Sequence, residues 1–314
     1  MNELQQILLS EAPLWISPSG YRQLMVAAFS LPSAEPPAAI ASLLFDEKTY
    51  KTKCKEALQG IKAKQEAENG VTLTDDFSSP ELPERSIAYH RIFGPITAHS
   101  RWYFSTIRFE RDILDAEANP LIAAHLLHIC SPGGEAYYLD RLSETLDKCE
   151  KPVVAIYEQA CSAAYHIACH AQLLYASTKF DFVGCIGTMT SFYDFEPYYT
   201  SLGIRRIEAK ATQSDLKNKV FDDLRKGKSQ QYIDEFLNPM NRDFLACVKA
   251  HRSKLASLED DAPVLRGETY YTDAAIEIGL ADGQRTFDEV VAETAALANK
   301  YADNQFVRDM IYNI

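Results

Sequence analysis

The chain of 314 residues has little positive charge, since 32 Lys and Arg oppose 44 Asp and Glu for a formal net charge of −12. A general nucleic-acid binder needs a basic face to neutralise phosphates, so we expect no nucleic-acid partner. The sequence has no run approaching the roughly 18 apolar residues of a membrane-spanning helix. Its opening segment, MNELQQILLSEAPLW, carries an early Glu and no basic stretch. We therefore expect neither a membrane anchor nor a secretory signal.

Cysteine occurs seven times but never as a C-x-x-C pair. An odd number is not the signature of a secreted disulfide framework. Four of the seven lie in apolar surroundings, in the segments HICSP, QACSA, HIACH and VGCIG. Such cysteines pack as small buried hydrophobes in a reducing compartment. We expect a cytoplasmic protein with free cysteines and no structural zinc site.

Two segments rich in proline or polar residues interrupt the N-terminal quarter of the chain. Residues 1–30 and 40–68 have helical composition, and three prolines within 31–39 predict a hinge between them. Residues 69–84, rich in Asp, Ser, Thr and Pro, predict a second linker. We therefore expect three parts: a helical N-terminal extension with a Pro-rich hinge over 1–84, a main domain over 85–296 and a C-terminal tail over 297–314.

Within the main domain, strand and helix patterns alternate, which predicts an α/β fold. The run LIAAHLLHIC is almost wholly apolar and predicts a strand buried on both faces of a sheet. Further strands are predicted at 86–93, 152–157, 173–177, 188–195 and 204–212. Helices are predicted at 105–118, 134–150, 162–171 and 228–254, the last with one apolar stripe.

A glycine turn, Ser131-Pro132-Gly133-Gly134, follows the predicted buried strand and precedes a predicted helix. Two glycines let the backbone turn sharply with its N–H groups exposed, and the helix N-terminus favours negative charge. Such a turn can hold a developing oxyanion. A plain strand-to-helix turn needs the same glycines, and the tetrapeptide by itself favours that plainer interpretation.

Ser162 is flanked by small residues and begins a predicted helix. It is either a helix N-cap or a nucleophile, and the residues alone favour the cap. A serine nucleophile needs a base, but His166 and His170 lie on the same short helix and point away from the hydroxyl. Their spacing suits a metal, yet the glutamate of a zincin and a clear third ligand are missing. We therefore expect both histidines to be structural.

Lysine is the other base available to a serine. It acts as one only when burial or positive neighbours lower its pKa. Lys210, Lys217 and Lys219 lie in the loop near the predicted strand 204–212. From the residues alone, each of them is most simply a solvated surface charge.

Five segments, in order, resemble the signal peptide peptidase A family of serine proteases, which belongs to the Clp-protease/crotonase fold superfamily. They are SIAYHRIFGPI, HICSPGG, ACSAAYHIA, GCIGTMTSF with LGIRRIEAKATQSDLKN, and TYYTDAAIEIGLADG. The resemblance spans about residues 86–282. It implies an α/β fold with a Clp-protease/crotonase-like repeated ββα core, behind the helical N-terminal extension.

The resemblance also implies a Ser/Lys dyad without cofactor or metal. Ser162 falls on the nucleophile of the family and Lys217 on its general base. The loop has two more residues between Lys210 and Lys217 than the family pattern, so Lys219 stays open as an alternative base. Ala163-Ala164 and Cys185 also depart from the pattern, which has Gly-Gly and Ser there. The oxyanion hole is assigned to the N–H groups of Gly133, Gly134 and Ala163, with Gly134 favoured of the two glycines.

On this resemblance we expect a serine endopeptidase that cleaves proteins or peptides as a homo-oligomeric ring. Processing of a phage capsid scaffold is the favoured role, in the bacterial cytoplasm or the assembling phage head. Three alternatives stay open: a cytoplasmic peptide-degrading enzyme, a catalytically inactive assembly protein and a crotonase-type acyl-CoA enzyme. An acyl-CoA enzyme would need neither Ser162 nor the lysine loop.

Overall fold

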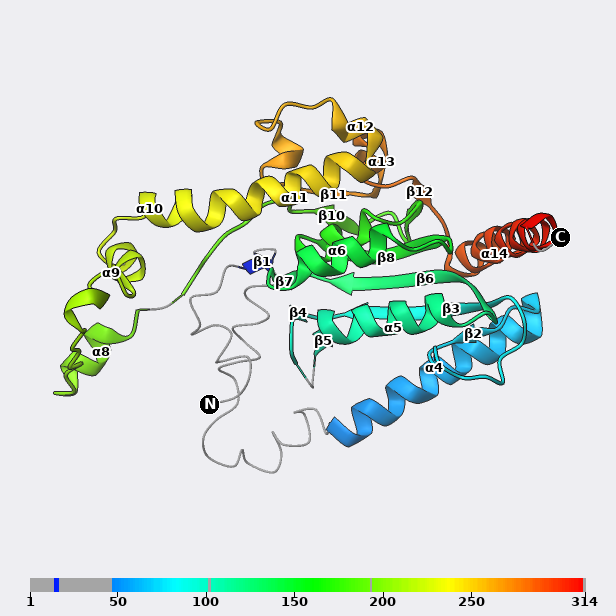
Figure 1. Ribbon diagram of the computed structural model, residues 1–314, viewed down its shortest axis with the longest axis horizontal. Helices are drawn as coiled ribbons and strands as arrows, with labels where there is room; N and C mark the ends of the chain where they lie inside the picture. Colours follow the sequence, from blue (N-terminus) through cyan, green and yellow to red (C-terminus); the bar gives the residue numbers. More distant parts are fainter. Residues whose placement is uncertain (1–13, 17–46, 101–102, 193, 313–314) are drawn as a thin grey trace.

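The computed structural model of the chain describes residues 14–16, 47–100, 103–192 and 194–312. Its architecture is mixed α/β, with a mostly parallel sheet between two groups of helices (Figure 1). The larger sheet has the strand order β11-β10-β8-β6-β3-β2, and β9 pairs with both β8 and β12. A smaller sheet has the order β1-β7-β4-β5. The predicted α/β class is confirmed.

The elements have the following bounds. The strands are β1 (Leu14–Ile16), β2 (Leu73–Thr74), β3 (Ser86–Phe93), β4 (Ile96–Thr97), β5 (Phe104–Ser105), β6 (Ile122–Ser131), β7 (Gly133–Glu135), β8 (Val153–Cys161), β9 (Leu173–Ala176), β10 (Phe182–Gly184), β11 (Thr269–Tyr271) and β12 (Gly283–Gln284). The main helices are α4 (Glu47–Asn69), α5 (Thr106–Ala118), α6 (Leu139–Asp147), α7 (Ala163–Ala168), α11 (Asn238–His251), α13 (Thr272–Ile278) and α14 (Phe287–Tyr312). Shorter helical pieces are α8 (Glu196–Ser201), η1 (Thr212–Ser214), α9 (Lys219–Arg225), α10 (Gln230–Tyr232), η2 (Ile233–Leu237), α12 (Ser253–Ala256) and η3 (Pro263–Leu265).

The core depends on β6, the apolar run that the sequence predicts as a buried strand. Because successive side chains of a strand point to opposite faces, Leu127 and Ile129 join the apolar cluster with α5, α6, α7 and α11. Leu126 lies on the other face, in the cluster with α14. The prediction of a strand buried on both faces is confirmed.

Several predicted elements differ from those observed. The segment after Ser131 forms strand β7 before α6 begins at Leu139, so the two glycines do not open a helix. No strand is described within 188–195 or 204–212. The second of these segments is exposed, and a strand is stable only when a neighbouring strand takes up its backbone hydrogen bonds.

The N-terminal region differs from the prediction where the structure describes it. Residues 14–16 form β1 rather than helix, and the rest of 1–30 and the hinge 31–39 lie outside the described residues. Within the predicted linker 69–84, β2 adds to the edge of the larger sheet beside β3. At the other end, α14 runs without interruption across residue 296. The three domain ranges stay predictions.

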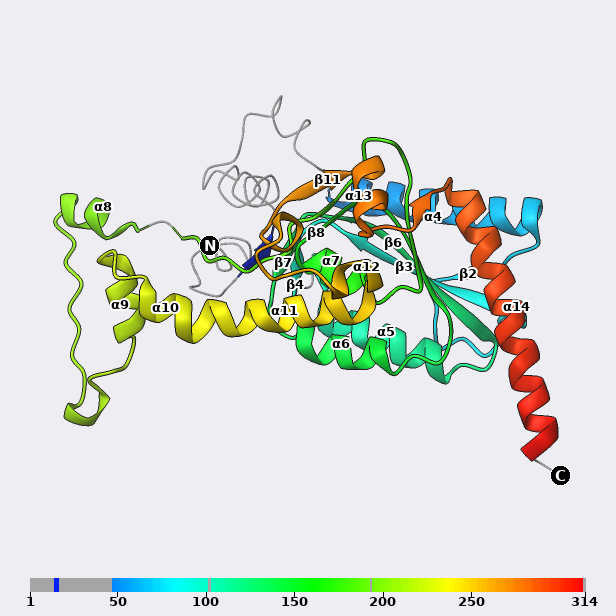
Figure 2. The same cartoon turned by 90° about the horizontal axis from the view of Figure 1, so that it is seen from above.

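Residues 188–237, here called the arm, leave the body after β10 and return through α10 and α11. In both views α8 and α9 lie at the end of the molecule opposite α14 (Figure 1 and Figure 2). Across the described residues, no helix combines the length and apolarity that crossing a bilayer requires.

Arg252 joins the long helix α11 to the end of the α/β domain. Its guanidinium is 6% exposed and donates to both carboxylate oxygens of Asp282, at 3.1 and 2.9 Å. Asp282 also accepts from the backbone N–H of Leu174 at 2.8 Å. The pair therefore ties α11 to the segment after α13 and to β9.

We predict that Asp282→Ala lowers the free energy of unfolding by about 3 kcal/mol, because it leaves a buried guanidinium without its counter-charge. The matched control is Asp260→Ala, since Asp260 pairs with Lys249 but is 69% exposed. That variant should lose less than about 1 kcal/mol. Urea unfolding followed by circular dichroism measures both, and equal losses would contradict a structural role for the buried pair.

Candidate active site

The candidate site lies at the carboxyl ends of two neighbouring parallel strands. In the register of β6 and β8, Ser131 lies opposite Ala160. The glycine turn follows the first of these residues, and Ser162 follows the second by two positions. Parallel strands end at the same edge of a sheet, which is where α/β proteins place their sites. Pairing therefore places the turn and Ser162 close together although they are far apart in the chain.

Ser162 has an unusual backbone and an unpartnered side chain. Its φ of 55° and ψ of −119° lie outside the helical region, between β8 and the six-residue α7. The backbone is held by hydrogen bonds from the Ser162 N–H to the Gly184 carbonyl at 2.8 Å and from the His166 N–H to the Ser162 carbonyl at 2.9 Å. The residue is 1% exposed, and its Oγ has no hydrogen-bond partner among the described residues. Ser162 is therefore not a side-chain cap of α7.

Strand β7 carries the two glycines and packs against α7. Gly133 has a φ of 96°, which favours glycine. A Cβ at Gly134 would lie 2.0 Å from the carbonyl oxygen of Ile96, because β4 runs parallel to β7 at close approach. On its other edge β7 pairs antiparallel with β1, with Gly134 opposite Trp15. Gly134 is thus required by the backbone contact itself.

Ala163 is the first residue of α7 and is fully buried. The N–H groups in the first turn of a helix have no acceptor within that helix. The N–H of Ala163 is therefore available to a group bound beside Ser162. Of the three predicted oxyanion-hole residues, Gly133 and Gly134 come from β7 and Ala163 from α7, two elements in contact.

The three candidate lysines all lie on the arm, away from Ser162. Lys210 forms ion pairs with Glu208 at 3.1 Å and Asp222 at 3.4 Å. The hydrogen bond with Glu208 raises the pKa of Lys210 above its usual value, which favours the charged amine over a base. Lys219 is paired with Asp223, and Lys217 is exposed in the turn before α9. A single chain does not bring any of them to Ser162 (Figure 2).

Two buried thiols flank the serine but are poor nucleophiles. Burial raises the pKa of Cys185 to about 11 and raises that of Cys161 further above its usual range. Because the thiolate is the reactive form of cysteine, both side chains are inert near neutral pH. Among the side chains at this edge, Ser162 is the one whose hydroxyl is ready to react.

A pocket of about 370 Å³ adjoins the site where β7 leads toward α6. Tyr137 and Met240 give it apolar walls, whereas Arg141 and Asp243 contribute charges. His166, from α7, closes it on the side of the candidate nucleophile. The pocket is therefore a candidate subsite for a substrate side chain.

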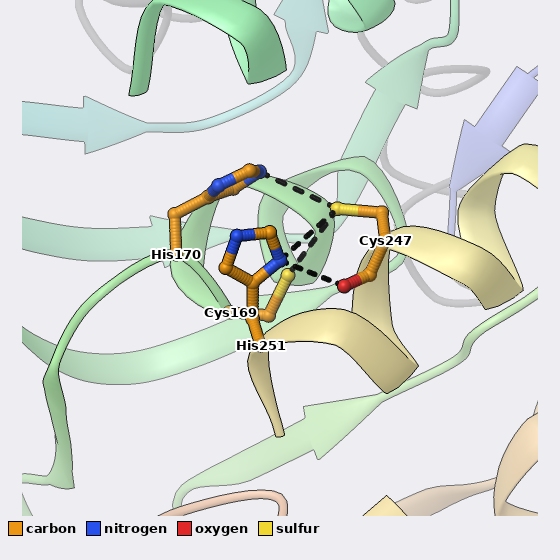
Figure 3. Close-up of side chains that lie close together, drawn as sticks. All are labelled: Cys169, His170, Cys247 and His251. Atoms are coloured by element: carbon orange, nitrogen blue, oxygen red, sulfur yellow. Dashed lines mark hydrogen bonds between the residues drawn. The ribbon is translucent and has the colours of Figure 1, made fainter. Parts of the chain in front are cut away.

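A second cluster lies behind α7. Cys169, His170, Cys247 and His251 place their sulfur and ring nitrogen atoms within 4.8 Å of one another (Figure 3). Hydrogen bonding to Cys247 raises the pKa of His251 to about 9. Sequence reasoning missed this cluster because its halves are far apart in the chain. The spacing Cys247-x-x-x-His251 within a predicted helix is the signal that could have pointed to it.

Comparison with known proteins gives a family for the C-terminal half of the chain. The model of Peptidase family S49 matches residues 145–300. The match includes Ser162, the lysines of the arm and the closing segment, whereas the glycine turn lies before it. No match was found among the curated proteins. The predicted resemblance to a peptidase family is confirmed.

Among solved structures, the chain is similar to a protein from Magnetospirillum magneticum AMB-1 described as an enoyl-CoA hydratase/carnithine racemase. The two share 17% identity with a TM-score of 0.32. The similarity covers 63% of this chain and 65% of the other, so the chain spans just under two thirds of that protein.

We predict that Gly134→Ala lowers the free energy of unfolding by about 1–3 kcal/mol, because the new methyl group forces β4 and β7 apart. The matched control is Gly60→Ala in α4, where a Cβ meets no atom within 4 Å. That change should be neutral or stabilise by up to about 1 kcal/mol. Chemical denaturation measures both, and a tolerated Gly134→Ala would contradict the close approach of β4 and β7.

Proposed function

Since the chain belongs, over residues 145–300, to peptidase family S49, we propose that it hydrolyses peptide bonds with Ser162 as nucleophile and Lys217 as general base. The observation that carries the proposal is the Ser162 hydroxyl, buried beside the glycine turn without a hydrogen-bond partner among the described residues. Leaving a buried hydroxyl unpaired costs about 1–3 kcal/mol. Backbone strain of the kind at Ser162 also clusters at functional sites. A purely structural serine would gain from neither feature.

The oxyanion of the reaction would be held by backbone N–H groups from two elements. Gly134 of β7 and Ala163 of α7 are the proposed donors, and Gly133 allows the turn that presents the first. Such donors stabilise the charge that develops in the transition state. They need no cofactor, and none is part of the proposed chemistry.

An extended peptide is the substrate form that β7 can accept. The chain's own residues Leu14–Ile16 pair antiparallel with β7, opposite Gly133 to Glu135. Addition of a strand to a sheet edge is a common mode of peptide recognition, in which backbone hydrogen bonds supply the affinity. We propose that a substrate peptide takes the same edge when β1 leaves it.

The base would come from a neighbouring subunit. Lys217 lies on the arm, which projects from the body and exposes many large apolar side chains, namely Tyr198 (60%), Tyr199 (50%), Leu202 (57%), Ile204 (54%), Ile207 (88%) and Leu216 (71%). An exposed apolar surface of this extent marks an interaction site. We propose that the arm packs on the next copy of the chain in a homo-oligomeric ring. Burial there would lower the pKa of the lysine amine and so make it a base.

The reaction then follows from these positions. The neutral amine of Lys217 takes the proton of Ser162 as Oγ attacks the peptide carbonyl carbon. The resulting ammonium gives this proton to the leaving amine as the C–N bond breaks, and an ester with Ser162 remains. Water, activated by the same amine, hydrolyses the ester and regenerates both side chains.

Among the biological roles that the resemblance implies, processing of a phage capsid scaffold stays our favoured proposal. The N-terminal 84 residues would serve there as a docking or assembly segment, and α4 provides its described helix. Clearance of cytoplasmic peptides is the second candidate. The crotonase-type and inactive alternatives are separated from a peptidase by the reactivity of Ser162.

We predict that a fluorophosphonate probe labels the wild-type protein and not Ser162→Ala. Wild type should also cleave unfolded casein with a rate that rises with pH as the base deprotonates, whereas Ser162→Ala and Lys217→Ala should be inert. Lys226→Ala is the matched control, since it removes another exposed lysine of the arm. Intact-mass spectrometry across pH 6–10, flagged as roughly the range of a lysine base whose pKa is lowered, follows both reactions. Identical behaviour of wild type and Ser162→Ala would exclude the peptidase.

A mixing experiment tests the origin of the base. If Lys217 acts on the next subunit, unfolding and co-refolding inert Ser162→Ala and Lys217→Ala proteins in equal amounts should restore about a quarter of wild-type activity in a head-to-tail ring. One interface in four would then combine the intact serine with the intact lysine. A mixture that stays inert, while wild type refolded in the same way is active, would place the base within one chain. If Lys217→Ala is active by itself, Lys219 is the alternative base.

A further inference from the structure

We propose that Cys169, His170, Cys247 and His251 form a zinc site that fastens α7, the helix of the candidate nucleophile, to α11. Two ligands directly follow α7, and the other two are four residues apart on α11. Residues i and i+4 lie on one face of a helix, so Cys247 and His251 both point toward the end of α7 (Figure 3). The proposal stands on geometry and does not depend on the peptidase reaction.

The separations between the ligand atoms match those around a tetrahedral ion. Zinc binds cysteine sulfur at about 2.3 Å and histidine nitrogen at about 2.0–2.1 Å. Tetrahedral angles then put two sulfurs about 3.8 Å apart, and a sulfur and a nitrogen about 3.6 Å apart. Observed are 3.7 Å from Cys169 Sγ to Cys247 Sγ, 3.4 Å from Cys247 Sγ to His170 Nε2 and 3.9 Å from Cys247 Sγ to His251 Nδ1.

A carboxylate orients both histidine rings. One oxygen of Asp147, the last residue of α6, lies 2.9 Å from His170 Nδ1 and 2.8 Å from His251 Nε2. Each histidine donates to it the hydrogen of the nitrogen that faces away from the sulfurs. Metal-bound histidines are almost always held in this way, and the partner increases the basicity of the ligating nitrogen. One acidic residue serving two histidines also explains why three separate helical segments meet here.

Two further contacts show what must change when the ion binds. His251 Nδ1 lies 2.8 Å from the carbonyl oxygen of Cys247, a contact that requires a proton on this nitrogen. The Ser143 hydroxyl lies 2.8 Å from His170 Nε2 and 3.6 Å from Cys247 Sγ. Binding would release the proton of His251 Nδ1 and those of the thiols. The Ser143 hydroxyl would then donate to the Cys247 thiolate.

The donor set points to zinc and to a structural role. Two thiolates and two imidazoles in tetrahedral arrangement are the ligands of structural zinc sites, which are closed by four protein ligands. Cys169 is fully buried and His170 and Cys247 are partly buried, so the site has little room for a substrate. An ion here would fix α7 against α11, the helix through which the arm returns to the body. Its effect should therefore appear in the stability of the folded protein.

The test is the zinc content of full-length protein purified without chelator. We expect about one zinc per chain by plasma mass spectrometry, and close to none in Cys169→Ser or Cys247→Ser. Cys130→Ser is the matched control, since Cys130 is a free, partly buried cysteine outside the cluster. His99→Gln, at an exposed histidine, is the control for His251→Gln. Both controls should keep their zinc.

A second measurement covers ligand variants that fail to fold. Wild type stripped by chelator under reducing conditions should take up one equivalent of Zn²⁺ with a rise in melting temperature, and Co²⁺ should give the charge-transfer band of a thiolate complex. Asp147→Asn keeps all four ligands and should weaken zinc binding by about 10–100-fold. The proposal is overturned if reduced wild-type protein binds no Zn²⁺ and its melting temperature does not change. The cluster would then be a metal-free pair of the Cys247 thiolate and the His251 imidazolium, bridged by Asp147.

Discussion

The parallel pairing of β6 with β8 is the constraint on which the candidate site depends. It sets Ser131 opposite Ala160, and everything chemically notable about this edge of the sheet follows from that register. The glycine turn leaves one strand as Ser162 leaves the next, so backbone donors and a hydroxyl meet without any side-chain contact to guide them. A shift of one residue in the register would turn the apolar side chains of β6 to the wrong faces, and both apolar clusters of the core resist it.

The Ser162 segment combines features that are unfavourable when taken one by one. Its backbone has a positive φ, its side chain is buried without a partner among the described residues, and its neighbour strand β7 approaches β4 so closely that only glycine fits. The surrounding sheet and the packing of α7 hold these features in place. Such a concentration of local cost at the end of a well-packed strand is what a preformed reaction site requires.

The second half of the proposed dyad and the proposed zinc site both concern helix α11 and the arm before it. The arm carries Lys217 and an exposed apolar surface, so its contacts are to be found on another copy of the chain. At the root of the arm, Cys247 and His251 face the residues directly after α7. The two proposals therefore describe one connection, from the subunit interface through α11 to the helix that begins beside the nucleophile.

By itself, the sequence determined the α/β class, the buried strand β6, the helix α5 and the position of Ser162, because hydrophobic periodicity and local motifs are properties of neighbouring residues. Only the tertiary structure decided that the glycines lie in a strand, since the closeness of Ile96 to Gly134 depends on strand pairing. The same holds for the meeting of Cys169 with Cys247, which are separated by 78 residues. Contacts between distant segments arise from packing, and no local pattern in the chain encodes them.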